Sequence, residues 1–230
     1  MSQNFEQSIV FGNDGALIRH RVLRNTYWLL ALSMIPTVLG AWLGIQMNFA
    51  LFPKSPGISF LFFMAIAFGF MYAIEKTKES ATGVAVLLGF TFFMGLMLSR
   101  LISYTLGYSN GGTLIMTAFG GTAAILAVMA SIATTSKRDF SGMGKWLFVG
   151  LMVIIVASIA NIFLHVPALY LTISVIAIGI FSAYILYDVQ QVINGGETNY
   201  ISATLRIYLD VYNIFVNLLS ILGIFGGERD

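Results

Sequence analysis

The chain has 230 residues and a formal net charge of +2, and 58% of its residues are hydrophobic while only 10% are charged. A soluble domain carries about 25% charged residues, so these few charges cannot cover a globule, and a soluble enzyme is excluded. The small positive surplus is typical of membrane proteins rather than of nucleic-acid-binding proteins, so no nucleic-acid partner is expected. The absence of cysteine removes disulfides, thiolate metal sites and cysteine nucleophiles.

Apolar runs recur along the whole chain, each long enough to cross a hydrocarbon core of about 30 Å. Charged, glycine-rich or proline-rich breaks separate them. The predicted spans, in chain order, are residues 27–47, 58–74, 83–106, 113–133, 146–164, 168–192 and 203–225. A polar tail precedes the first span, so that span is not expected to be a cleavable signal.

We therefore predict an all-α polytopic membrane protein built as a bundle of seven transmembrane helices. Three regions are expected: a cytoplasmic N-terminal tail at 1–26, a membrane domain at 27–225, and a short C-terminal tail at 226–230. Residues 1–14 are polar enough that we expect them to be disordered. The last span is polar enough that a re-entrant hairpin is the alternative to a full crossing.

Basic residues predict the orientation, because cytoplasmic loops are enriched in Lys and Arg. Eight of them fall on one side of the predicted bundle: Arg19, Arg21, Arg24, Lys76, Lys78, Lys137, Arg138 and Lys145. The opposite side offers Lys54, Arg100 and Arg229. The N-terminus is therefore expected in the cytoplasm, and a chain that crosses seven times ends outside it.

Small residues within the spans predict close approach between helices. The glycines concerned are Gly40, Gly44, Gly69, Gly89, Gly95, Gly120, Gly121 and Gly179. On the fifth span, Ser158, Asn161 and His165 share one helical face. We expect these three side chains to hydrogen-bond to other helices.

Two acidic residues fall inside predicted spans, where an ionisable group costs ~2.5–3.5 kcal/mol on insertion scales and indicates a functional site. Asp188 lies toward the inner end of the sixth span, and Asp210 lies in the inner half of the seventh. Antiparallel spans joined by a short loop are neighbours, so the two carboxylates are expected to meet. Such a pair shares one proton, and it can sense pH or bind a hard cation such as Ca²⁺.

Asp210 also belongs to a polar stripe on the seventh span. At about 100° per residue, Arg206, Asp210, Asn213 and Asn217 fall within a sector of roughly 60°. This stripe cannot face lipid, so the seventh helix is expected at the centre, surrounded by the other six. The alternative is that Asp210 pairs with Arg206 while Asp188 lies hydrated at the membrane interface.

Sequence patterns of common enzyme sites are missing from the chain. It contains no P-loop, GxSxG, HExxH or Rossmann fingerprint, and no pattern of an intramembrane protease. We therefore expect neither an enzymatic activity nor a cofactor, with Ca²⁺ considered only as a bound or transported ion. The sequence leaves the oligomeric state open.

Five segments carry a likeness to a known family: VLRNTY at 22–27, FGGTA at 119–123, NIFLHVPAL at 161–169, NGGETNYISAT at 194–204 and YNIFVNLLSILG at 212–223. With these segments the chain resembles the Bax inhibitor-1 (TMBIM) family of seven-helix membrane proteins, most closely its bacterial YccA branch. The resemblance covers essentially the whole chain and is most specific in its last third.

The resemblance implies two functions. In the first, the protein lies in the bacterial inner membrane, with its C-terminus in the periplasm. There it binds and modulates the membrane-anchored, ATP-dependent protease FtsH, which engages the cytoplasmic N-terminal tail. In the second, the protein is a pH-sensitive calcium leak channel gated by an aspartate pair, at the positions of Asp188 and Asp210. An orphan transporter would be a third class, but no internal repeat or broken helix favours it.

The chain departs from both branches of the family. The YccA branch lacks the seventh-helix aspartate, which stands here as Asp210. Channel-type members carry an acid within the second helix and an arginine near its cytoplasmic end. Here the second span is uncharged before Glu75, and only Lys76 or Lys78 stands near the place of that arginine.

Overall fold

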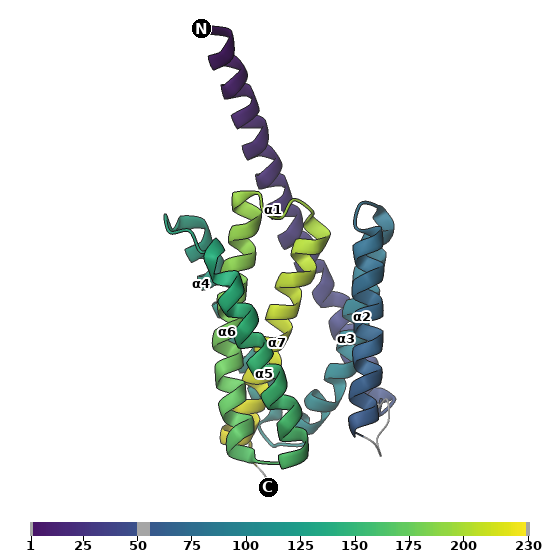
Figure 1. The fold of residues 1–230 in the computed structure, drawn as a ribbon. Helices are drawn as coiled ribbons and strands as arrows, with labels where there is room; N and C mark the ends of the chain where they lie inside the picture. The colour runs from purple at the N-terminus through teal and green to yellow at the C-terminus, as the bar shows by residue number, and fades with distance from the viewer. Residues whose placement is uncertain (1, 50–55, 229–230) are drawn as a thin grey trace.

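The computed structural model describes residues 2–49 and 56–228. This part of the chain is entirely helical, with seven long helices, one short 3₁₀ helix and no strand (Figure 1). The all-α prediction is thus confirmed. Lys54 and Arg229, used above to predict the orientation, and the end of the predicted tail at 226–230 lie outside the described residues.

The helices follow one another with short connections. Their bounds are α1 Ser2–Gln46, α2 Pro56–Thr77, α3 Ala81–Leu106, α4 Gly111–Thr135, η1 Ser141–Met143, α5 Gly144–Leu164, α6 Pro167–Asn194 and α7 Tyr200–Gly226. Seven helices are long and apolar enough to cross a membrane, which confirms the seven-span prediction. The last of them is one continuous helix, so the re-entrant hairpin is wrong.

The first helix differs most from its prediction. It begins at Ser2, although residues 1–14 were expected to be disordered, and its N-terminal part projects beyond the other helices (Figure 1). Only the part from Ile18 to Gln46 is a candidate span. Once a span has formed a helix, each added residue gains a hydrogen bond at little further cost. Residues 2–26 contain no proline to stop that extension.

Glycine brings α1 and α3 together in the most extensive helix pair of the described bundle. A Cβ atom at Gly40 would overlap the carbonyl oxygen of Phe92, and one at Gly95 would overlap that of Thr37. We call this contact, with Gly44 facing Ser99 one turn further along, the α1–α3 seam. Other glycines of the predicted set have open space where a Cβ would stand: Gly69, Gly120 and Gly179.

The seventh helix is anchored by a buried tyrosine. The hydroxyl group of Tyr208 lies 2.9 Å from Oγ1 of Thr37 on α1 and 3.4 Å from the carbonyl oxygen of Thr91 on α3. All three residues are at most 8% exposed. Because these contacts join α7 to the α1–α3 seam, they fix the rotation of α7 about its own axis.

Among the described residues, α7 packs against α1, α2, α3, α4 and α6. It is central to the bundle, but the expectation that all six other helices surround it is wrong for α5. Within the described chain, the backbone of α5 packs on α6 and η1 rather than on α7. The physical reason is a cavity, lined from both sides, that separates α5 from α7.

The turn between α5 and α6 also differs from its prediction. Oδ1 of Asn161 accepts a hydrogen bond from the backbone N–H of Val166 at 3.0 Å. Nδ1 of His165, which adopts a left-handed conformation with φ 53°, lies 3.1 Å from the carbonyl oxygen of Phe163. These contacts cap the C-terminal end of α5 and do not join it to another helix. The tight turn into Pro167 leaves backbone N–H and C=O groups that need local hydrogen-bond partners. The predicted interhelical bonds of these two residues are therefore wrong.

Candidate functional site

A cavity of about 640 Å³ lies between α2, α3, α5, α6 and α7. Most of its lining is aliphatic or aromatic, and its polar wall comes mainly from α6 and α7. That wall includes every site residue indicated by the sequence: Asp188, Arg206, Asp210, Asn213 and Asn217. The polar stripe of α7 thus faces a cavity and not the core of a closed bundle.

The structure brings Asp188 and Asp210 together. The two side chains are close enough to interact electrostatically, and they are only 7% and 5% exposed. Helix geometry places Asp188 about 9 Å before the end of α6 and Asp210 about 15 Å after the start of α7. Both carboxyl groups therefore lie within the bundle, at the wall of the cavity.

One oxygen atom of this pair is not satisfied within the described chain. Oδ2 of Asp210 is buried and has no hydrogen-bond partner there. A buried polar atom without a partner costs about 1–3 kcal/mol, and more when it is charged. Asp210 also lines the cavity, so a proton, a cation or a donor group near the pair could satisfy this acceptor.

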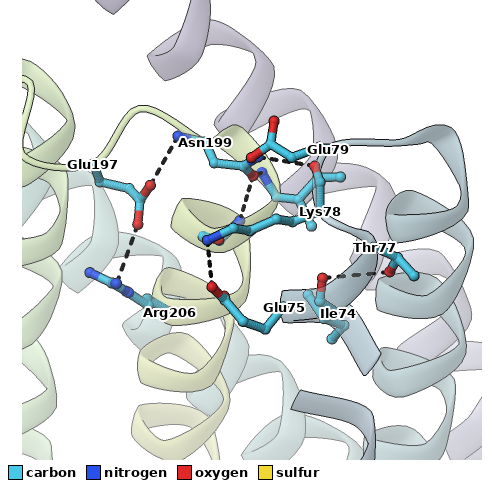
Figure 2. Close-up of polar contacts among 10 residues, drawn as sticks. Ile74, Glu75, Thr77, Lys78, Glu79, Glu197, Asn199 and Arg206 are labelled. Carbon is cyan, nitrogen blue, oxygen red and sulfur yellow. Dashed lines mark hydrogen bonds and ion pairs between the residues drawn. The ribbon is translucent and has the colours of Figure 1, made fainter. Parts of the chain in front are cut away.

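Arg206 does not form an ion pair with Asp210. Its Nη2 atom lies 3.2 Å from Oε2 of Glu197 in the connection before α7 (Figure 2). Arg206 also lines the cavity that the two carboxyl groups line. With Asp188 buried, the alternative of an Arg206–Asp210 pair and an interfacial Asp188 is wrong.

Asn213 and Asn217 are half-buried in the polar wall. Their Nδ2 groups donate to the carbonyl oxygens of Leu209 and Asn213, each at 2.8 Å. These bonds fold both amides back onto α7. The two asparagines therefore make the cavity wall polar without contacting the carboxyl pair.

The lysines after the second span do not reach the cavity. Lys78 donates from Nζ to Oε1 of Glu75 at 2.5 Å (Figure 2), and this hydrogen bond raises the pKa of Lys78. Lys76 lies over the ring of Tyr72, 5.6 Å from its centroid. Neither lysine lines the cavity, so the basic residue beside the aspartates is Arg206 of α7.

A further polar contact, which was not predicted from the sequence, lies at the start of α7. Oδ1 of Asn199 accepts from the backbone N–H groups of Ile201 and Ser202, at 2.9 and 3.1 Å, and so caps α7. Its Nδ2 group donates to the carbonyl oxygen of Lys78 at 3.0 Å and to Oε1 of Glu79 at 3.1 Å (Figure 2). Asn199 therefore joins the α6–α7 loop to the α2–α3 turn. An asparagine just before an apolar helix is a recognised capping signal.

We expect Asn199→Ala to lower the free energy of unfolding by about 1–2 kcal/mol, because the helix cap and the contact between loops are lost together. The matched variant Asn199→Asp keeps the capping acceptor but removes the Nδ2 donor and places a second carboxylate beside Glu79. Its stability should fall between those of wild type and Asn199→Ala. Thermal unfolding of the purified proteins in detergent measures both effects. Equal midpoints for wild type and Asn199→Ala would show that the contact contributes nothing.

A resident metal site is not apparent in the described chain. No group of three or more His, Cys, Asp and Glu residues gathers there, whereas Ca²⁺ takes about 6–8 oxygen ligands. Asp188 and Asp210 would thus supply only part of the coordination of a calcium ion. Calcium binding by the pair stays a prediction.

The comparisons with known proteins agree with the resemblance described above. The family model described as "Inhibitor of apoptosis-promoting Bax1" matches residues 19–227. The chain is 39% identical over 207 residues to the Escherichia coli protein named modulator of FtsH protease YccA, covering 90% of this chain and 91% of that protein. It is 38% identical over 212 residues to a Neisseria meningitidis protein, covering 91% and 93%. A Campylobacter jejuni protein is 35% identical over 227 residues, covering 98% of both chains. This seven-helix membrane protein therefore belongs to the Bax inhibitor-1 family.

Proposed function

We propose that the protein lies in the inner membrane of a bacterium, where it binds and modulates an FtsH-type membrane protease and catalyses no reaction itself. The observation that carries this proposal is the 39% identity, over 90% of the chain, to a protein named modulator of FtsH protease. A second Escherichia coli relative, also 39% identical over 90% of the chain, is named inner membrane protein YccA. This name supports the location.

The N-terminal part of α1 supplies a segment that such a protease can engage. Between Ser2 and Ile18, α1 continues outside its candidate span and projects from the bundle (Figure 1). This part is about 24 Å long. Isolated helices shorter than about 12–15 residues are marginal in water, and this one is little longer. It can therefore unwind when it is gripped, while the membrane-spanning part of α1 stays packed on α3.

We propose that this projecting segment lies in the cytoplasm and that the C-terminus lies in the periplasm, as the distribution of basic residues indicates. A reporter enzyme that is active only in the periplasm should be active when fused after Asp230 and inactive when fused before Met1. The same fusions with a reporter active only in the cytoplasm serve as the matched control and should give the reverse pattern. Periplasmic activity of the N-terminal fusion would contradict this orientation.

Co-purification tests the protease proposal. The tagged full-length protein, expressed in cells with an inactive but ATP-binding FtsH-type protease, should retain that protease after mild detergent extraction. An unrelated multi-pass protein with the same tag and abundance is the control. Equal recovery of the protease with both proteins would refute the proposal.

The second candidate function is a proton-sensitive calcium leak, and the buried carboxyl pair favours it. Ca²⁺ prefers carboxylate oxygens, and Asp210, which lines the cavity, carries a buried Oδ2 atom without a hydrogen-bond partner in the described chain. A proton competes with the cation for the same oxygens, so proton concentration would control occupancy. Protease modulation and calcium leak use different parts of the molecule, namely the projecting end of α1 and the cavity.

A further inference from the structure

The cavity has an apolar wall as well as a polar one. Side chains of α2 and α5 form the apolar wall, among them Phe63, Ile155 and Ile159. On α5 this wall extends from Leu151 to Ile162, which is about 17 Å of helix. The total volume of about 640 Å³ falls within the roughly 300–1,000 Å³ of small-molecule sites.

The apolar wall is open to the surrounding membrane. In the described bundle the backbones of α2 and α5 do not pack against each other, and neither α1 nor α4 packs its backbone on α2 or α5. No described helix therefore closes the space between α2 and α5. Three isoleucines of the α5 wall remain 37–38% exposed: Ile155, Ile159 and Ile162. A solute dissolved in the hydrocarbon core can enter the cavity sideways.

The charges at the polar wall favour a ligand with a single positive charge. Arg206 and Glu197 neutralise each other, and the other titratable groups of the lining are the carboxyl pair and three tyrosines, Tyr184, Tyr187 and Tyr212. Two carboxyl groups that share one proton carry one negative charge. An anionic head group would be repelled there, while a monovalent cation would neutralise the wall.

An ammonium group also matches the hydrogen-bonding and aromatic groups of the wall. A primary ammonium carries three donors and no acceptor, so it can satisfy the buried Oδ2 atom of Asp210. Tyr184 lines the cavity one helical turn before Asp188 on α6, and Phe181 contacts its ring at a centroid distance of 6.3 Å. Aromatic rings beside a desolvated cation attract it further.

From this arrangement we propose that the cavity binds lipophilic amines, with the ammonium group at Asp188 and Asp210 and the alkyl chain along the apolar wall of α2 and α5. The site uses the carboxyl pair of the proposed calcium leak but requires no conduction. A bound amine would occupy the position proposed for Ca²⁺, so amines of this kind would block the leak if it exists.

The test measures equilibrium binding of dodecylammonium to the full-length protein in phosphatidylcholine nanodiscs, with empty nanodiscs subtracted. Dodecanol, which has the same chain without the charge, is the matched probe. We expect saturable binding of one dodecylammonium per chain and only non-saturable partitioning of dodecanol. Asp188→Asn and Asp210→Asn should each weaken dodecylammonium binding by about tenfold or more, the factor expected when a charge-assisted hydrogen bond is lost.

Two further variants test the apolar wall without touching the carboxyl pair. Ser158→Phe places a ring in the cavity and should abolish saturable binding. Val156→Phe adds the same ring two residues earlier, on a side chain that is 66% exposed, and should leave binding unchanged. Glu228→Gln, which removes an exposed carboxylate at the other end of the bundle, should also change nothing.

Equal binding of dodecylammonium and dodecanol to wild type would overturn the proposal, and so would full binding by Asp210→Asn or by Ser158→Phe. Because binding is measured rather than flux, a failure here leaves the calcium leak untouched. In the same way, absence of calcium flux does not affect this site.

Discussion

Calcium flux into proteoliposomes that contain Asp188→Asn or Asp210→Asn should be the same in mildly acidic and mildly alkaline buffer, whereas flux through wild type should change with pH. The physical reason is that the two carboxyl groups are close together and buried, so we expect them to share one proton. An asparagine in either place removes the mutual repulsion and the shared proton. The expected effect is a complete loss of the pH dependence, from either substitution.

The two substitutions should act alike because the structure buries both residues at one site. If Asp188 were interfacial, its replacement would have little effect, while the replacement of Asp210 would destabilise the fold. Thermal unfolding of both variants in detergent separates a lost sensor from a lost fold. Glu228→Gln is the matched control, since it removes an exposed carboxylate outside the cavity and should keep the pH dependence. A pH dependence that persists in both aspartate variants would exclude the pair as the sensor.

Deletion of residues 2–17 should prolong the lifetime of the protein several-fold in cells that contain an FtsH-type protease. This deletion removes the projecting part of α1 but keeps the candidate span from Ile18 to Gln46. A processive ATPase needs a segment that it can grip, and the described connections between α2 and α7 are short. Pulse-chase measurement of the full-length and shortened chains, at equal expression, gives the two lifetimes.

Two controls make the deletion experiment specific. In cells without the protease, both chains should be equally long-lived. A chain in which residues 2–17 are replaced by a flexible segment of equal length should be degraded as fast as wild type if only accessibility matters. Equal turnover of full-length and shortened chains in the presence of the protease would contradict the role of α1 as the handle.

Much of the fold follows from hydropathy alone, because a span of about 20 apolar residues is a strong signal. The six helices from α2 to α7 begin and end within three residues of their predicted spans. The start of α1 was not predicted. The composition of residues 1–14 is that of a polar tail, and composition alone does not show that a helix formed in the membrane can continue beyond it. The place of α5 was missed as well, because helix packing depends on contacts between segments that are distant in sequence.

Periodicity explains why the site was partly predictable. Residues three and four apart share a helical face, so the stripe from Arg206 to Asn217 could be derived, and it lines the cavity. The partner of Arg206 could not be derived, because Glu197 lies in a connection whose backbone path has no periodic signal. The second contact of Asn199, with the α2–α3 turn, is tertiary in the same way.

The α1–α3 seam has a mechanical consequence. Force applied to the N-terminal part of α1 is transmitted along one continuous helix to the α1–α3 seam, where glycines allow the two backbones to approach closely. Close-packed interfaces deform little under force. A force along α1 therefore acts on all contacts of the seam in parallel, and the helices separate only when many contacts break together. Extraction from the membrane would therefore be slow. An unfoldase bound to this chain would be unavailable to other substrates until the α1–α3 seam separates.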